Sequence, residues 1–319
     1  MNREDFIKEP VEDIRVSERD TVADLIEKYC KVHGFTAADV CRAVEVLSEG
    51  LRNSDLRFLS FTANLVATGL RGLLAQMVRS GYFDVVVTTC GTLDHDVARS
   101  LGHKYYKGYF EADDVVLAKS DIHRLGNVFI PVENYGPPVE RLVKDVLREL
   151  GKTMVAPYEL IWEVGKRLSD ENSILRAAWE RKVPVIVPGI TDGAFGTAIF
   201  TYSEELKLQG KDFCLDVLAD EKLLSDMVFS SKRSAALVVG GGISKHHVIW
   251  WNQFKGGLDY AVYLTTAQEY DGSLSGARPR EAITWGKLKP EGRSATVYGD
   301  ATVLLPIIWA GVLAKVQKA

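Results

Sequence analysis

The segment 265–287, TTAQEYDGSLSGARPREAITWGK, concentrates side chains that could act on a bound molecule. Lys287 lies two residues after Trp285 and six residues after Glu281. A lysine beside an indole can lose solvation, which depresses its pKa and frees the amine to attack a carbon centre. Turn-forming residues such as Gly272 favour a loop whose polar side chains converge on a ligand. Lys287 is therefore the predicted nucleophile.

A histidine pair supplies a candidate for proton transfer. His246 and His247 follow the glycines at 240–242 and open a predicted helix. Histidine exchanges protons near neutral pH. Adjacent helical residues point about 100° apart, so the pair cannot hold one metal ion. We expect no metal site and assign proton transfer to His246, although the residues alone leave a structural role equally open.

Several carboxylates follow or precede the predicted strands and could gather at one edge of a sheet: Asp94, Asp96, Asp192, Asp271 and Glu281. Carboxylates with an indole such as that of Trp285 make a pocket for a cationic amine, through ion pairing and cation–π attraction. Together with a nucleotide site and a nucleophilic lysine, such a pocket predicts hydride removal from an amine and capture of the resulting imine on Lys287.

The elements that must position these residues form an alternating α/β pattern. Short β-branched apolar runs predict buried parallel strands at residues 84–89, 183–188, 235–239, 260–265 and 295–298. Helices are predicted at residues 61–81, 138–150, 157–168, 171–181, 215–230 and 301–314. This pattern predicts an α/β fold with a doubly wound, mostly parallel sheet and helices on both faces, of Rossmann-like type.

Small residues follow each predicted strand, at 90–92, 189–193, 240–242, 266–269 and 299–301. In an open parallel sheet the ligand crevice lies at the carboxyl ends of the strands, so these turns predict a nucleotide site. Asp192 and Asp300 are placed as acceptors for ribose hydroxyls would be. Neither GxGxxG nor GxxxxGK[ST] is present, so neither an ordinary dinucleotide fingerprint nor a P-loop is supported.

The chain is predicted to divide into an amino-terminal arm with two helices, 1–55, and one catalytic α/β domain, 56–319. Thr21 and Thr36 precede the two amphipathic runs that predict these helices. Either the helices pad the core of the main domain or the arm reaches a neighbouring subunit. Residues 101–135 are charged and aromatic and predict an insertion over the crevice or at an interface.

Composition excludes several classes of protein. The net charge of −4, without a long Lys/Arg cluster, argues against nucleic-acid binding. No stretch approaches the roughly 18 apolar residues of a membrane span. The four cysteines include no CxxC pair, so we expect neither a zinc site nor a disulfide framework, and a reducing, cytoplasmic location.

Long motifs resemble those of the deoxyhypusine synthase family. The resemblance covers TANLVATG, VVTTCG, VPGITDG, GGGISKHH, LDYAVYLTTAQEYDGSLSGARPREAITWGKL and VYGDATV, in the family's order. It implies a homotetramer with active sites at subunit interfaces, where the amino-terminal arm covers a neighbour's site. It also implies that NAD oxidises spermidine, that propane-1,3-diamine leaves, and that Lys287 holds the aminobutyl fragment as an imine. The fragment then passes to a lysine of the hypusine-bearing translation initiation factor.

The same resemblance implies roles for individual residues. Lys287, His246 and Glu281 would be catalytic, and the amine would be bound by Trp285, Gly272, Ser273, Asp94 and Asp271. NAD would be bound by Asn64, Thr89, Gly91, Asp192, Gly241, Thr266, Ala267, Asp300 and Ala301.

The sequence departs from the eukaryotic pattern of this family at three positions expected in the amine pocket. Leu274, Thr197 and His95 stand where that pattern has carboxylates, and each lost ammonium contact could weaken binding by about 1.5 to 3 kcal/mol. Trp250, interpreted like Trp251 as a packing residue, also replaces a small polar residue. These departures fit two explanations equally: an archaeal branch of the family, in which Asp94, Asp271 or a neighbouring subunit supplies the charge, or a changed amine donor.

Three functions stay open. The first is a deoxyhypusine synthase. The second is an enzyme of the same mechanism with another donor or acceptor, such as agmatine as donor or putrescine as acceptor giving homospermidine. The third is a catalytically silent paralogue that acts as a structural partner, against which Lys287 argues.

Overall fold

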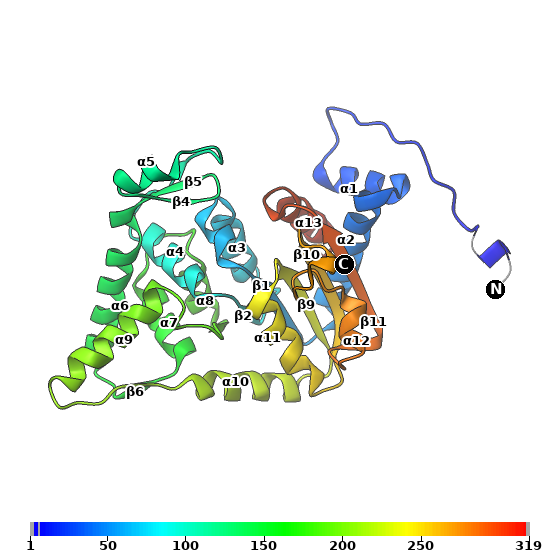
Figure 1. Ribbon diagram of the computed structural model, residues 1–319. Helices are drawn as coiled ribbons and strands as arrows, with labels where there is room; N and C mark the ends of the chain where they lie inside the picture. The colour runs from blue at the N-terminus through cyan, green and yellow to red at the C-terminus, as the bar shows by residue number, and fades with distance from the viewer. Residues whose placement is uncertain (1–2, 6, 317–319) are drawn as a thin grey trace.

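The computed structural model describes residues 3–5 and 7–316 and is built on a six-stranded sheet (Figure 1). All pairings in this sheet are parallel. The strands lie in the order β11-β10-β9-β1-β2-β7. When these six strands are numbered along the chain and read from the β7 edge, the order is 3-2-1-4-5-6, as in dinucleotide-binding folds. The predicted doubly wound fold is confirmed.

The strands of this sheet are β1 (Leu56–Phe61), β2 (Val85–Val87), β7 (Val185–Ile186), β9 (Ser234–Val239), β10 (Leu258–Thr265) and β11 (Leu288–Tyr298). The larger helices around it are α3 (Leu70–Arg79), α4 (Cys90–Ser100), α6 (Gly136–Leu150), α7 (Pro157–Arg167), α8 (Ile174–Arg181), α9 (Ala194–Lys207), α10 (Val217–Ser230), α11 (Gly242–Gln253) and α13 (Ala301–Val316). The five predicted strands are present, and so are the helices predicted from residue 138 onward.

Side chains alternate between the two faces of the sheet and form two cores. Leu59 and Phe61 of β1 belong to a cluster that includes residues of α2 (Phe35–Asn53), α3 and α13. Phe58, which precedes Leu59 and therefore points to the opposite face, belongs to a second cluster with residues of α10, α11 and α12 (Pro279–Ile283). Parallel sheets covered by helices on both faces are buried in this way.

The central strand β1 was missing from the sequence prediction. A helix was predicted over residues 61–81, but β1 ends at Phe61, a 3₁₀ turn (Ala63–Ala67) follows, and α3 starts only at Leu70. The helix prediction was therefore wrong at its amino end. Arg57 interrupts the apolar pattern of β1, and its Nε donates to Asp84 Oδ2 at 2.8 Å. Asp84 immediately precedes β2, 27 residues further along the chain. The residues around Arg57 therefore gave no sign that its charge would be paired, and the strand was not predicted.

The insertion at residues 101–135 forms a small structure of its own. Strands β3 (Tyr106–Lys107), β5 (Val128–Pro131) and β4 (Ile122–Leu125) make an antiparallel sheet beside α5 (Asp114–Lys119). A two-stranded parallel sheet, β6 (Met154–Val155) with β8 (Cys214–Leu215), completes the described strands. Among the described residues, no helix is long and apolar enough to cross a membrane.

Helices α1 (Val22–Val32) and α2 precede the sheet. Thr21 caps α1 as predicted, since its side chain accepts from Asp24 N at 3.2 Å and Asp24 accepts in return from Thr21 N. Helix α2 begins at Phe35, before Thr36, and packs on β9, β10 and β11. Residues 7–21, before α1, form no helix or strand and project away from the body of the molecule (Figure 1). The division of the chain at residue 55 stays a prediction.

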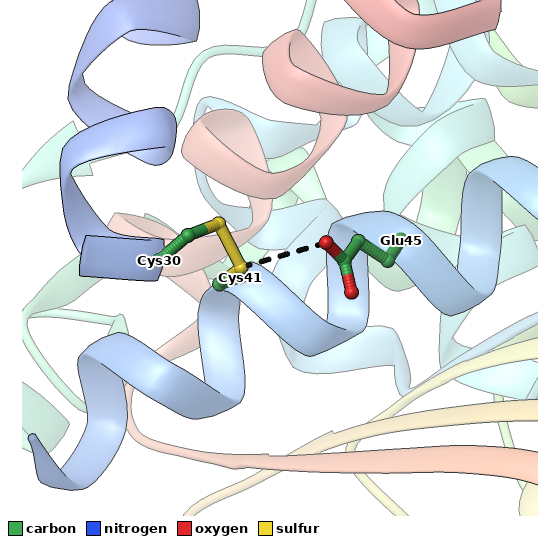
Figure 2. A group of neighbouring side chains, drawn as sticks. All are labelled: Cys30, Cys41 and Glu45. Atoms are coloured by element: carbon green, nitrogen blue, oxygen red, sulfur yellow. Dashed lines mark hydrogen bonds between the residues drawn. A yellow bond between two sulfur atoms is a disulfide. The ribbon is translucent and has the colours of Figure 1, made fainter. Parts of the chain in front are cut away.

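A disulfide between Cys30 and Cys41 joins α1 to α2 (Figure 2). The expectation of no disulfide was wrong, because it relied on CxxC spacing and the two cysteines lie on separate helices. Glu45 Oε1 lies 3.8 Å from Cys41 Sγ. Among the described residues, Cys30, Cys41 and Glu45 form the one group of three or more His, Cys, Asp or Glu side chains whose ligand atoms lie close enough together for a metal ion. Disulfide sulfurs are not thiolates and do not form such a site.

Candidate active site

A cavity of about 330 Å³ opens between α11, α12 and the carboxyl end of β10. Most of its wall comes from α11 and from the loop 265–287 that follows β10. The lining residues are Lys245, His246, Ile249, Trp250, Tyr263, Leu274, Ala277, Arg278, Glu281, Ala282, Trp285 and Lys287. The cavity therefore brings together the predicted catalytic residues Lys287, His246 and Glu281 with the predicted pocket residue Trp285.

Lys287 immediately precedes β11, and its side chain lines the cavity. Its backbone N–H donates to Ala282 O at 2.9 Å, which ties it to the end of α12. The residue is 8% exposed, and its Nζ lies 5.2 Å from the ring centroid of Trp285 and 5.7 Å from that of Trp250. Two indole faces thus surround this amine, an arrangement that also suits a bound alkylammonium.

His246 lies in the first turns of α11 and stacks on Trp250, four residues further along the same helix. Their ring centroids are 5.7 Å apart, with planes inclined at 25°. Burial lowers the pKa of His246, and the positive charge of Lys287 lowers it further. A neutral imidazole beside Lys287 can accept a proton. His247 points elsewhere, with its Nε2 3.3 Å from Glu221 Oε1 on α10.

Glu281 is the carboxylate that the described residues contribute to the cavity wall. It lies on α12 and is exposed. Arg278, one turn earlier, also lines the cavity, and its guanidinium pairs with Glu269 on the loop outside. Because Arg278 is paired, Glu281 is available to a cationic ligand.

Some residues of the cavity were missed or misinterpreted from the sequence. Trp250 was interpreted as a packing residue, but it is 43% exposed and lines the cavity. Its spacing of four residues from His246 on one helix face was the signal that could have placed it there. Trp251 does pack, and its Nε1 donates to Glu221 at 2.7 Å. Lys245 and Tyr263 received no role from the sequence.

The turns of the predicted nucleotide site meet between β1 and β9, where the order of the strands in the sheet reverses. An added Cβ on Gly240, after β9, would lie 2.9 Å from Thr62 Oγ1, after β1. Ala63 N donates to Thr89 Oγ1 at 3.1 Å, and a Cβ on Gly91 would lie 3.0 Å from Ala63 Cβ. The turns after β1, β2 and β9 are therefore in contact, and they include the predicted cofactor residues Asn64, Thr89, Gly91 and Gly241.

Helix α11 starts at this crevice without a side-chain cap, because its N-cap residue is Gly241. Gly242 has a φ of 64° and open space where a Cβ would point. N–H groups at a helix amino terminus bind phosphate groups well; one of those of α11, Gly242 N, donates to Ser275 Oγ at 3.0 Å in this chain. The switch-point position, the close-packed small residues and this helix terminus fit a dinucleotide such as NAD.

The remaining predicted cofactor residues lie at the same edge. Gly299 N donates to Thr265 O at 2.9 Å, so the turn after β11 with Asp300 and Ala301 adjoins the turn after β10 with Thr266 and Ala267. Asp300 Oδ1 accepts from Thr302 N at 2.8 Å in the first turn of α13. Asp192 is exposed in the turn after β7, at the far edge of the sheet.

Several predicted amine-binding residues lie outside the cavity in this chain. Asp94 is fully buried on α4, where its carboxylate accepts from Ala194 N at 3.0 Å, Phe195 N at 2.8 Å and Tyr135 Oη at 2.8 Å. Burial raises the pKa of Asp94. Gly272, Ser273 and Asp271 are exposed, and Asp271 Oδ1 accepts from Ser273 N at 2.7 Å. Their binding roles stay predictions.

The three departures from the eukaryotic pattern occupy different places. Leu274 lines the cavity. Thr197 lies on α9 and donates to Gly193 O at 3.0 Å. His95 is buried on α4 with its Nδ1 2.9 Å from Tyr105 Oη, and burial lowers its pKa to about 4. Of these three departures, Leu274 is the one that lines the cavity of this chain, where it makes the wall apolar at a position that has a carboxylate in the eukaryotic pattern.

Comparisons with known proteins agree with this site. A family model described as deoxyhypusine synthase matches residues 24–312. A probable deoxyhypusine synthase of Sulfurisphaera tokodaii is 56% identical over 98% of this chain and 100% of its own length. One of Sulfolobus acidocaldarius is 55% identical with the same coverage.

A solved structure shows the same fold at low sequence identity. It is a candidate deoxyhypusine synthase of Entamoeba histolytica, 21% identical, with a TM-score of 0.64 over 93% of this chain and 94% of that one. With the family model and the archaeal relatives, which match nearly the full length, the conclusion follows: this chain belongs to the deoxyhypusine synthase family.

Proposed function

We propose that this chain transfers the 4-aminobutyl group of spermidine, with NAD, to a lysine of the hypusine-bearing translation initiation factor. The observation that carries the proposal is the position of Lys287, whose amine lies between two indoles in a cavity shared with His246 and Glu281. An amine nucleophile, a neutral imidazole and a single anionic anchor are the groups that imine transfer from a cationic amine requires.

The cavity is suited to hold an alkylamine in one orientation. Glu281 pairs with an ammonium group, and the faces of Trp250 and Trp285 attract positive charge. Ile249 and Leu274 contact the methylene chain and exclude water from it. The carbon to be attacked is thereby kept beside Lys287.

The turns at the β1–β9 switch point would hold NAD, which would supply a hydride acceptor for the oxidation of the amine and a hydride donor for the final reduction. His246 accepts the proton that the secondary amine of spermidine loses as its neighbouring carbon is oxidised. Lys287 Nζ adds to that carbon through its lone pair, the proton that Nζ loses passes to the nitrogen of the departing amine, and the carbon–nitrogen bond to propane-1,3-diamine breaks. The aminobutyl fragment is then an imine of Lys287. Exchange with the acceptor lysine frees Lys287 again.

The cofactor residues of the proposal are those at the carboxyl edge: Asn64, Thr89, Gly91, Asp192, Gly241, Thr266, Ala267, Asp300 and Ala301. A homotetramer with sites at subunit interfaces and a cytoplasmic location belong to the same proposal. They rest on the membership of the family.

A second candidate is the same chemistry with a donor that carries fewer or different charges, such as agmatine. Leu274 on the cavity wall favours it, because the described residues give the cavity one carboxylate, Glu281, for a donor with several ammonium groups. Agmatine would still place a cationic group on Glu281 and an alkyl chain against Leu274.

The test is to trap the imine. Purified protein is incubated with NAD and spermidine without acceptor, reduced with borohydride and digested for mass spectrometry. We expect an aminobutyl adduct on Lys287 and none in Lys287→Arg, which retains the charge but forms no imine. Folded protein that binds NAD yet yields no adduct would sink the spermidine proposal. The same experiment with agmatine then separates a changed donor from a silent structural partner.

A further inference from the structure

One wall of the cavity is formed by a segment with little regular structure. Between the 3₁₀ turn Glu269–Asp271 and helix α12, residues 272–278 make only local turns, such as Gly276 N to Ser273 O at 3.2 Å and Ala277 N to Leu274 O at 3.3 Å. Leu274 and Ala277 nevertheless line the cavity. Turns of this kind are mobile unless other contacts hold them.

Lys245 provides such contacts from the first turn of α11. Its Nζ donates to Leu274 O at 2.6 Å and to Ala277 O at 2.7 Å. It also lies 4.3 Å from the ring centroid of Tyr263 on β10. Lys245 is 1% exposed, and burial lowers its pKa to about 8. A buried ammonium is costly unless its donors are satisfied, so the two carbonyls and the Lys245 side chain depend on one another.

The same segment also contacts the candidate dinucleotide crevice. Ser275 Oγ accepts from Gly242 N at 3.0 Å, and a Cβ on Gly241 would lie 2.2 Å from that oxygen. The segment 274–277 therefore lies between the cavity and the amino terminus of α11. Its position affects both.

We propose that Lys245 is a positioning residue, which holds the segment 274–277 in place as the wall that shapes the amine cavity. It is not a second nucleophile, since its donors are committed to carbonyl oxygens. The effect on amine affinity rests on the proposed function, whereas the effect on the segment itself does not.

The test compares Lys245→Met with Lys255→Met. Lys255 follows the end of α11, is half-buried and donates one hydrogen bond to Ser231 Oγ at 2.6 Å, outside the cavity. Hydrogen exchange is measured by mass spectrometry on peptides covering 268–284, without amine or NAD. We expect exchange at Gly276 and Ala277 to become at least about 10-fold faster in Lys245→Met only. Lys245→Arg, which retains a cation with several donors, is expected to restore most of the protection.

Amine binding is then measured by tryptophan fluorescence, because Trp250 and Trp285 line the cavity. We expect the spermidine Kd to rise about 10-fold in Lys245→Met and to stay unchanged in Lys255→Met. Unchanged exchange in the segment would overturn the positioning role. If Lys245→Met does not fold, Lys245→Gln, which reaches fewer carbonyls, carries the same comparison. Wild-type protein that binds no spermidine would refute the proposed donor, while the exchange result would still decide the role of Lys245.

Discussion

The two halves of the sheet's carboxyl edge use their carboxylates differently. On the β2–β7 half, Asp94 and Asp96 are fully buried, and each accepts three or more hydrogen bonds from the protein. On the β9–β11 half, Glu281 is exposed on the wall of a cavity. All three lie on helices that follow strands of this sheet, Asp94 and Asp96 on α4 after β2 and Glu281 on α12 after β10. A carboxylate whose oxygens are already satisfied stabilises the fold, and only one with free oxygens can bind a ligand.

The two buried lysines of the cavity show the same distinction. The pKa of Lys245, lowered by burial to about 8, would nominate it as the nucleophile. Its Nζ is held by two carbonyl oxygens, whereas Nζ of Lys287 faces two indole rings in the open cavity. Geometry therefore favours Lys287, as the sequence motif did.

The largest effect that tests the comparison is expected at Asp96. Its Oδ1 accepts from Arg71 Nε at 2.6 Å, and its Oδ2 accepts from Ser173 Oγ and Leu175 N, each at 2.8 Å. Asp96→Ala removes one of the two carboxylates that pair with buried Arg71, the other being Asp170 at 2.7 Å, and leaves Ser173 Oγ and Leu175 N without this acceptor. The combined loss should lower the free energy of unfolding by about 3–5 kcal/mol. Denaturant unfolding measures the loss.

The control for this prediction is Asp271→Ala, since Asp271 is exposed and accepts from Ser273 N, two residues away. Its unfolding free energy should change by less than about 0.5 kcal/mol. An Asp96→Ala protein of normal stability that binds spermidine weakly would break the distinction between the two halves.

The disulfide between Cys30 and Cys41 should give the next largest effect. It links α1 to α2, and α2 covers β9–β11 on the face opposite α11. Closing a loop of about a dozen residues restricts the unfolded chain, so Cys30→Ala/Cys41→Ala should lower the free energy of unfolding by about 2–3 kcal/mol. Spermidine affinity should not change, because the cavity lies on the other face. Dithiothreitol should destabilise only the wild type; equal sensitivity of the double variant would refute the assignment.

The sequence predicted the fold class, and Lys287, His246 and Glu281, which it selected, line one cavity, while their catalytic roles stay predictions. Sequence reasoning failed where partners distant in the chain determine the structure. Periodicity identified five strands because their apolar runs are local. It missed β1, because Arg57 of this strand pairs with Asp84, which lies just before β2 and far from Arg57 in the sequence. It missed the disulfide because two helices must pack before Cys30 and Cys41 meet. Asp94 was grouped with the cavity carboxylates because strand-end position is visible in a sequence and hydrogen-bond partners are not.

The smallest expected effect is also the one that addresses the ligand most directly. Glu281→Gln keeps the shape of the side chain and removes its charge, and no hydrogen bond to its carboxylate holds the fold among the described residues. We expect the spermidine Kd to rise about 10-fold, through loss of one ammonium contact worth about 1.5 kcal/mol. The melting temperature should stay within about 1 °C of wild type, because the group is exposed. Trp250 and Trp285 report the binding by fluorescence.

If Glu281→Gln binds spermidine as the wild type does, the amine is not anchored at Glu281, the one carboxylate that the described residues give to this wall. A neighbouring subunit would then have to supply the charge, and Asp94 would return as a candidate only if Asp94→Asn weakened binding in a protein of normal stability.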